Sequence, residues 1–311
     1  MLKPLFFCQV PKTCVKIMLC MPDAQRRVRV KKGREKKMTE HVQIKTAKWD
    51  SGEMEYFRFG RGKETLVIVP GLSVQSVMRS ADAVAQAYKA LTDDYTIYVF
   101  DRRKDLPAAY SVRDMAEDTA SAFRALGLGQ VNLFGASQGG MISMEIAVRC
   151  PELVKKLVLG STSACVTEGQ FALIEKWIQL AEDGDAAALY SAFGEALYPE
   201  ALYNAARELL IELAKSVTDE ELRRFVVMAK ALKGFHITDE LAKISCPVLV
   251  IGDEDDRVLG AEASREIADR MGGRPGVELY MYDGCGHAAY DTAPDYKERI
   301  ARFLSGQAAL E

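Results

Sequence analysis

The nine residues LFGASQGGM, numbered 133–141, decide the fold class of this chain. They place Ser137 between glycines, directly after an apolar run and directly before a segment of helical periodicity, 141–149. G-x-S-x-G in such a strand–turn–helix setting is typical of a sharp turn that exposes a nucleophilic serine above a sheet. The flanking glycines make room for a strained backbone there. A glycine-rich structural turn is the alternative. A nucleophilic serine requires partner residues elsewhere in the chain, and their presence distinguishes the two interpretations.

Short apolar runs alternate with helical segments on both sides of this turn. The runs are rich in Val, Ile and Leu, as in parallel strands that are buried on both faces. They lie at 65–71, 95–101, 131–135, 156–160, 247–253 and 277–284, with helical segments at 76–91, 111–127, 262–272 and 294–305. A hairpin around residues 50–52 precedes them, and Ser111 with Asp114 forms a capping box for the second helix. The alternation predicts an α/β fold with a mostly parallel, doubly wound sheet.

One interval, residues 161–244, contains amphipathic helices and no strand-like run. It is too long for a simple crossover between two strands. We interpret it as an inserted helical cap over the carboxyl edge of the sheet, where ligands bind in such folds. The aromatic residues of this interval favour an apolar substrate group, although most of them are expected to pack between helices. Residues 38–160 and 245–311 then form the core.

A nucleophilic serine needs a base, and the chain has only three histidines: His41, His236 and His287. His287 lies in the glycine-flanked loop DGCGHAAYD after the last predicted strand, so it leaves the same end of the sheet as Ser137. The orienting acid is expected in GDEDDRVLG, which offers four carboxylates at 253–256. The chain order serine, acid, histidine is the one expected for this architecture.

Two backbone N–H groups are expected to hold the oxyanion of the reaction. One belongs to Gln138, the residue after the serine, and the other to the loop that follows the first parallel strand. That loop reads VPGLS, in which Gly71 permits close approach and Leu72 supplies the second donor. A plain Pro-Gly turn is the alternative interpretation of this loop.

These motifs resemble those of the α/β-hydrolase superfamily, over residues 42–305. The resemblance is specific in the serine turn, in DDRVLG and in GCGHAAYD. The members most similar in plan are cap-bearing esterases, C–C hydrolases, proline iminopeptidases and cofactor-free haloperoxidases. Pro70 stands where the family often has histidine in the oxyanion loop, and Ala136 where many relatives have histidine before the nucleophile, so the subfamily stays open. Serine at position 137 argues against haloalkane dehalogenases and epoxide hydrolases, which use aspartate.

The resemblance also selects the acid. In similar proteins the acid stands one residue before a turn of the form D-x-V-x-P or D-x-V-x-G, and Asp256 matches that register. Asp253 is assigned to the strand end and Asp255 to a solvent-facing turn. The expected catalytic residues are therefore Ser137, Asp256 and His287, with Leu72 and Gln138 as oxyanion donors.

The resemblance implies a carboxylesterase-like serine hydrolase, EC 3.1.1.-, that cleaves ester-like bonds of a small, apolar substrate through an acyl-enzyme. No metal and no organic cofactor is expected. Aminopeptidase, C–C hydrolase and cofactor-free haloperoxidase activities remain alternatives. A further alternative is a ligand sensor that retains the same three residues but turns over slowly.

Composition indicates the broad class of the protein and its expected location. Of 311 residues, 49% are hydrophobic and 27% charged, as in a globular protein able to bury a large core. Apolar runs long enough to span a bilayer are lacking, so no membrane span is expected. The seven cysteines form no C-x-x-C pair, and a cytoplasmic location is the default expectation. We expect a small-molecule substrate and no nucleic-acid partner, and the sequence leaves the oligomeric state open.

The first 37 residues differ in charge from everything after them. They carry eleven Lys or Arg and two Asp or Glu, whereas the remaining chain carries 30 and 42. Pro4, Pro11 and Lys12 interrupt the apolar region that a secretory signal needs. The stretch KKGREKK contains only residues that purine codons can encode, as a translated ribosome-binding site would. We interpret residues 1–37 as sequence upstream of a start at Met38, with a disordered basic tail as the alternative.

Overall fold

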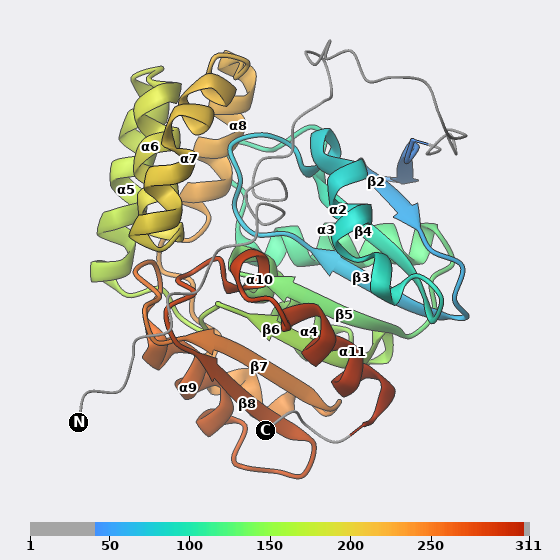
Figure 1. Cartoon of the computed structure of the whole chain (residues 1–311). Helices are drawn as coiled ribbons and strands as arrows, with labels where there is room; N and C mark the ends of the chain where they lie inside the picture. Colours follow the sequence, from blue (N-terminus) through green and yellow to red (C-terminus); the bar gives the residue numbers. More distant parts are fainter. Residues whose placement is uncertain (1–40, 308–311) are drawn as a thin grey trace, which may run out of the picture.

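The computed structural model describes residues 41–307, in which one eight-stranded sheet forms the centre of the molecule (Figure 1). The predicted leader, residues 1–37, lies outside the described residues. The strand order is β1-β2-β4-β3-β5-β6-β7-β8, and every neighbouring pair from β4 to β8 is parallel. The strands are β1 (Ile44–Trp49), β2 (Gly52–Phe59), β3 (Glu64–Val69), β4 (Tyr95–Arg103), β5 (Val131–Ala136), β6 (Val154–Gly160), β7 (Val248–Asp253) and β8 (Val277–Tyr282). The predicted fold class is confirmed.

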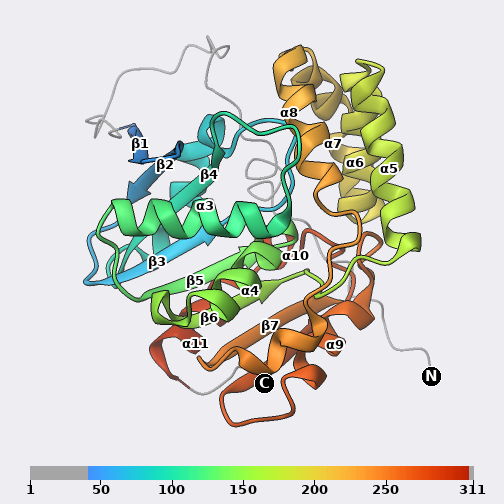
Figure 2. The same ribbon diagram turned by 180° about the vertical axis from the view of Figure 1, so that it is seen from behind.

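Helices cover both faces of the sheet, which makes it doubly wound (Figures 1 and 2). One face carries α2 (Ala81–Ala87), α10 (Ala289–Thr292) and α11 (Tyr296–Ser305), and the other carries α3 (Val112–Ala125), α4 (Gln138–Arg149) and α9 (Ala261–Arg270). Two large clusters of buried apolar side chains correspond to the two faces. The interior strands β5 and β7, each paired on both sides, are buried at every residue, as their continuous apolar sequence predicts.

Strand β8 departs from that prediction. Glu278 and Leu279 are exposed, and Leu279 keeps 40% of its surface accessible. The reason is its place in the sheet, since β8 is the edge strand and pairs only with β7. An apolar run predicts a strand but not its position in the strand order.

Local signals in the sequence decide where several helices begin. The predicted capping box at α3 is present: Ser111 Oγ accepts from the Asp114 N–H at 3.1 Å, and the Asp114 carboxylate accepts from the Ser111 N–H at 2.8 Å. The segment 76–91, expected as one helix, is divided into η1 (Val77–Ser80), α2 and η2 (Lys89–Leu91). The helix that closes the fold begins only at Tyr296, two residues after Pro294.

Between β6 and β7 the chain forms four α-helices that stand at one end of the sheet (Figure 2). They are α5 (Glu168–Glu182), α6 (Ala186–Leu197), α7 (Glu200–Ala214) and α8 (Asp219–Lys230), here called the helical layer. A short η4 (Thr238–Lys243) leads back into β7. A bridge between Cys165 and His236 joins the chain that enters the helical layer to the chain that leaves it.

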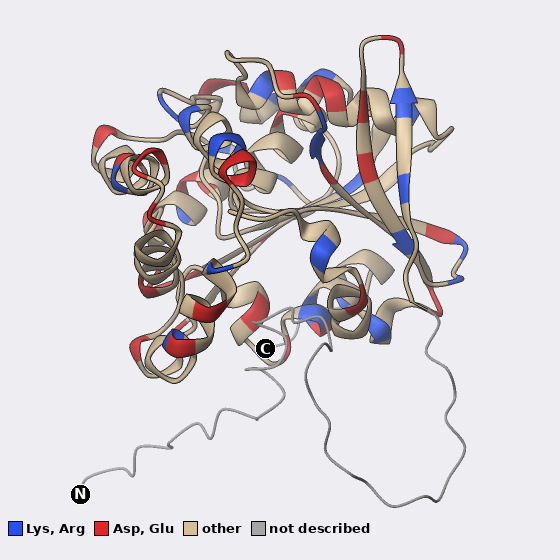
Figure 3. Cartoon of the chain, turned by 90° about the horizontal axis from the view of Figure 1, so that it is seen from above, with Lys and Arg blue, Asp and Glu red and all other residues tan. Residues whose placement is uncertain are grey.

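Charged residues of both signs are interspersed over these elements (Figure 3). Within residues 41–307, no helix is long and apolar enough to cross a membrane.

Candidate active site

Ser137 lies on the tight turn between β5 and α4, with φ of 52° and ψ of −124°. A positive φ is rare for a residue with a side chain and marks a strained backbone. The turn is held by hydrogen bonds from the Ser137 N–H to Gly160 O at 2.8 Å and from Thr162 Oγ1 to Ser137 O at 2.7 Å. Gly139 lets α4 approach β3, because a Cβ there would come within 2.0 Å of Val69 O.

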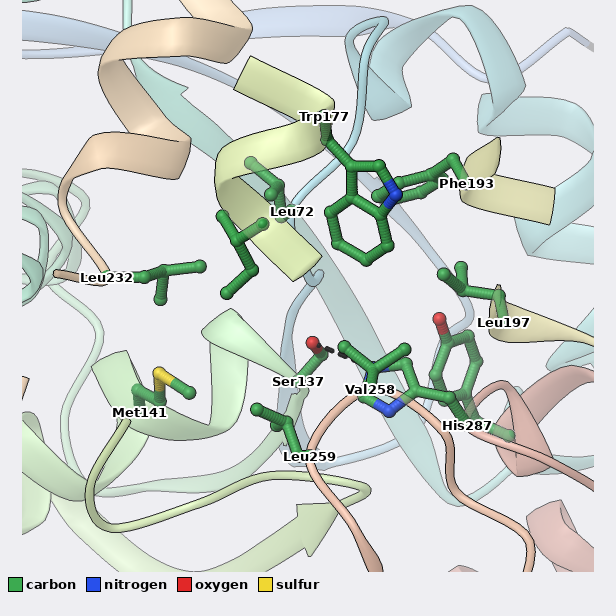
Figure 4. Close-up of a pocket in the computed structure, with 12 residues that line it drawn as sticks. Leu72, Ser137, Met141, Trp177, Phe193, Leu197, Leu232, Val258, Leu259 and His287 are labelled. Atoms are coloured by element: carbon green, nitrogen blue, oxygen red, sulfur yellow. Dashed lines mark hydrogen bonds between the residues drawn. The ribbon is translucent and has the colours of Figure 1, made fainter. Parts of the chain in front are cut away.

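The imidazole of His287 reaches Ser137 from the loop after β8. Its Nε2 lies 3.0 Å from Ser137 Oγ, within hydrogen-bond distance (Figure 4). Only 2% of His287 is exposed, so the ring is held within the protein rather than in solvent. The two residues are 150 positions apart in the chain, and the parallel sheet brings their loops to the same edge.

The other ring nitrogen of His287 faces Asp256, in the loop after β7. The Nδ1 atom lies 2.9 Å from Oδ2 and 3.0 Å from Oδ1 of Asp256. The same carboxylate accepts the N–H groups of Val258 at 2.8 Å and Leu259 at 3.0 Å. Burial opposes ionisation of Asp256, but the charge and hydrogen bond of His287 and these two N–H groups outweigh it and lower its pKa. An ionised Asp256 is thus well suited to fix the tautomer of His287.

The neighbouring carboxylates of this loop have other contacts. Asp255 is exposed, as expected, yet its Oδ2 also accepts the Gly284 N–H at 3.0 Å. Asp253 ends β7 and is fully buried, and its carboxylate accepts the N–H groups of Cys285 and Gly286, each at 2.9 Å. Asp253 therefore positions the loop that carries His287. This contact could not be predicted from the sequence, because the pattern shows only four carboxylates in a row.

The loop after β3 lies directly against the serine. A Cβ built on Gly71 would be 3.0 Å from Ser137 Cβ and 3.6 Å from Ser137 Oγ, so only glycine fits without a shift. Leu72 follows and lines the pocket above Ser137. The Gln138 side chain is buried and bonds to Arg102 and to the helical layer. The motif around Ser137 does not predict these contacts of the Gln138 side chain.

The other two histidines lie away from this constellation. His41 bonds to Asp82 at 2.6 Å near the start of the described chain, and its side chain is 90% exposed. His236 faces Asp239 at 3.5 Å and is 57% exposed. Of the three histidines, only His287 approaches Ser137.

A pocket opens above Ser137 and His287, between the sheet edge and the helical layer (Figure 4). Its empty volume is about 390 Å³, including the open mouth. Apolar side chains supply most of its lining: Leu72, Met141, Ile174, Trp177, Phe193, Leu197, Leu232, Val258 and Leu259, and Tyr290 also lines it. Trp177 packs edge-on against Phe193, with ring centroids 4.7 Å apart. Within residues 41–307, no group of three or more His, Cys, Asp or Glu side chains is arranged to hold a metal ion.

Comparison with known proteins defines the class to which this fold and site belong. Residues 56–299 match the alpha/beta hydrolase family, and the chain is a member of that family. A relative from Agrobacterium fabrum strain C58, named "Putative carbamate hydrolase RutD", is 29% identical over 225 residues, which cover 70% of this chain and 85% of that protein.

Two solved structures share the fold at lower sequence identity. MGS-M2, an alpha/beta hydrolase enzyme from a Medee basin deep-sea metagenome library, has a TM-score of 0.75 at 20% identity and covers 86% of this chain and 99% of its own. The enol-lactonase from Burkholderia xenovorans LB400 has a TM-score of 0.73 at 16% identity, with coverage of 84% and 100%. At these identities the likeness concerns the fold alone.

Proposed function

We propose that this alpha/beta hydrolase is a serine hydrolase in which Ser137 is the nucleophile, His287 the base and Asp256 the orienting acid. The observation that carries the proposal is the single buried imidazole between Ser137 Oγ at 3.0 Å and Asp256 Oδ2 at 2.9 Å. A structural glycine-rich turn has no need of such a contact, nor of a serine at positive φ.

The chemistry follows from the two hydrogen bonds. Ser137 Oγ–H donates to His287 Nε2, and His287 Nδ1–H donates to Asp256. As Oγ attacks an acyl carbon, its proton moves to Nε2, and the imidazolium later passes that proton to the leaving group. Water then attacks the acyl-enzyme with the same imidazole as base, which releases the acid and restores Ser137.

The oxyanion of each tetrahedral intermediate would be held by the N–H groups of Leu72 and Gln138. Two features support this assignment: Gly71 lies against Ser137, and Gln138 is the first residue of α4. The first N–H groups of a helix have no partner within it and point toward a bound anion. One such donor contributes about 3–4 kcal/mol in a well-studied serine protease.

The lining of the pocket favours a small, neutral acyl group. Apart from Ser137 and His287, the lining residues whose side chains carry a polar atom are Trp177 and Tyr290. No Lys, Arg, Asp or Glu lines it among the described residues. We therefore favour an apolar ester or lactone. Carbamate cleavage, which the names of the curated relatives suggest, is the second candidate, because a carbamate presents a similar acyl carbon.

The helical layer would act as a cap on this pocket. Its helices α5 and α6 supply Ile174, Trp177, Phe193 and Leu197 to the lining. An apolar roof excludes water from the acyl group and strengthens the electrostatic interactions beneath it.

Turnover of a substrate panel tests this proposal. p-Nitrophenyl esters of two to eight carbons, a lactone and an N-alkyl carbamate are compared on the wild type, Ser137→Ala and the control His236→Ala. We expect ester or lactone turnover in the wild type and in His236→Ala, and none above background in Ser137→Ala. Preference for the carbamate would select the second candidate. Binding of these compounds without turnover would favour a ligand sensor and overturn the proposal.

A further inference from the structure

A buried arginine connects the two sides of the proposed oxyanion hole. Arg102, near the end of β4, is 2% exposed. Its Nη2 donates to Pro70 O at 2.7 Å and to Gln138 Oε1 at 3.3 Å. Pro70 directly precedes Gly71 and Leu72, and Gln138 directly follows Ser137. One nitrogen atom therefore holds both segments that would supply the oxyanion donors.

The surroundings of Arg102 are unusual for a buried guanidinium. Both acceptors are neutral, and within residues 41–307 no carboxylate lies at ion-pair distance from it. The adjacent Asp101 is instead engaged by Ser76 Oγ at 2.5 Å and faces Arg224 at 3.7 Å. A buried cation is costly unless it is well paired, so an ordinary core position would not retain it.

The side chain of Gln138 extends the same connection to the helical layer. Its Nε2 donates to Met228 O on α8 at 2.7 Å, and the residue is 1% exposed. Arg224, one turn earlier on α8, donates to the carbonyl groups of Arg102 at 3.0 Å and Arg103 at 2.8 Å. Helix α8 is thus tied to the end of β4 and to the residue after Ser137.

We propose that Arg102 is a positioning residue for the oxyanion hole. It fixes the Pro70–Leu72 loop relative to Gln138. Because Gln138 also bonds to Met228, this geometry depends on the position of α8. The proposal rests on the proposed function above. An oxyanion hole requires donors placed within a few tenths of an ångström, and side chains that lock its backbone determine that placement. Arg102 is not among the residues that line the pocket, so it acts through its two neighbours.

Three variants test the proposal in the full chain with p-nitrophenyl butyrate. Arg102→Met keeps the length of the side chain but removes donors and charge, whereas Arg102→Lys restores both in part. Gln138→Glu keeps an acceptor for Arg102 and loses the donor to Met228 O. The matched control is Arg103→Met, the next arginine along β4, which bonds to Asp118 at 3.3 Å and to Ser51 O at 2.6 Å.

We expect Arg102→Met to lower kcat about tenfold to hundredfold, with KM changed by no more than about twofold, because only transition-state contacts are lost. Inhibition by a trifluoromethyl ketone, which forms a tetrahedral oxyanion adduct with the serine, should weaken by the same factor as kcat/KM. Arg102→Lys should recover part of both losses, Gln138→Glu should lower kcat, and Arg103→Met should keep the kcat of the folded protein even if its Tm falls.

Two outcomes would overturn the role of Arg102. One is an Arg102→Met enzyme with unchanged kcat. The other is an equal loss of kcat in an Arg103→Met enzyme that has the same Tm as Arg102→Met, which would indicate that general destabilisation causes the loss. If Arg102→Met does not fold, equal kcat in the wild type, Arg102→Lys and Gln138→Glu contradicts the proposal. Failure of the serine mechanism itself is distinguishable, since it would appear as retained turnover in Ser137→Ala.

Discussion

The carboxylate of Asp253 accepts the backbone N–H of Gly286 at 2.9 Å, one residue before His287. Its Oδ1 also accepts the Asp255 N–H at 2.8 Å, and its Oδ2 accepts the Cys285 N–H at 2.9 Å. Three N–H donors from two loops therefore converge on one buried side chain. Burial raises the pKa of Asp253, and these donors only partly offset that effect. The contact fixes the histidine loop against the end of β7.

Asp253→Asn should disturb this convergence, because an amide accepts at one atom only and would place its NH2 group against an N–H donor. An unsatisfied buried donor costs about 1–3 kcal/mol, and we expect the free energy of unfolding to fall by that amount. A shift of the histidine loop should lower kcat by at least about tenfold. Denaturant titration and ester turnover measure the two effects. Asp255→Asn is the control, since its single contact with Gly284 survives in an amide; an equal loss in both variants would contradict the role of Asp253.

Gly71→Ala probes the distance between the β3 loop and the serine. The added methyl group would lie 3.0 Å from Ser137 Cβ and 3.3 Å from Ala136 O, so the loop must move by a few tenths of an ångström. We expect kcat to fall about tenfold or more with little change in Tm, because the loop is at the surface of the pocket. Gly129→Ala, whose added methyl group meets nothing within 4 Å, should behave like the wild type. Wild-type kcat in Gly71→Ala would place the oxyanion donors elsewhere.

The backbone strain at Ser137 predicts an exchange of activity for stability. A side chain at φ of 52° and ψ of −124° is strained by about 1–3 kcal/mol, and glycine relieves that strain. Part of the gain is lost because glycine is more flexible in the unfolded chain, by about 0.5–1 kcal/mol. Both Ser137→Gly and Ser137→Ala should be inactive. We expect the glycine variant to be more stable than the alanine variant by about 1 kcal/mol. A glycine variant that is about 0.5–1 kcal/mol less stable than the alanine variant in denaturant titration would mean that the turn stores no strain.

The pKa of Asp256 predicts how stability depends on pH. A carboxyl whose folded pKa is below its unfolded value of about 3.9 adds stability above that value and loses it as the pH falls through the folded pKa. Between about pH 5 and pH 3, the wild type should therefore lose more stability than Asp256→Asn, which has no such titration. Denaturant titration of both proteins across this window measures the difference. A constant difference would show that folding leaves the pKa of Asp256 unchanged.

Much of the fold could be predicted from the sequence, because buried parallel strands and amphipathic helices have different periodicities. β5 and β7 are continuous apolar runs, and each lies between two neighbouring strands and is buried at every residue. β8 was expected to be buried as well, yet it is the edge strand, and strand order depends on contacts between distant segments. The division of 76–91 into three short helices likewise followed no visible signal.

The candidate site was predicted only where motifs occur. The structure brings Ser137, Asp256 and His287 together, and their catalytic roles stay a proposal. The contacts of Arg102 could not be predicted, because side chains alternate across a strand and nothing in the sequence shows which of two adjacent arginines points inward. Its partner Gln138 is 36 positions away, a distance that only the folded sheet spans.

Trapping the covalent intermediate tests the nucleophile directly. The protein is incubated with a fluorophosphonate, digested, and mapped by mass spectrometry, with Ser137→Ala and His287→Ala treated in parallel. We expect one adduct on the peptide that contains Ser137 in the wild type, much slower labelling in His287→Ala, and no adduct in Ser137→Ala. An adduct on another residue, or undiminished labelling of Ser137→Ala, would contradict the assignment of Ser137 as the nucleophile.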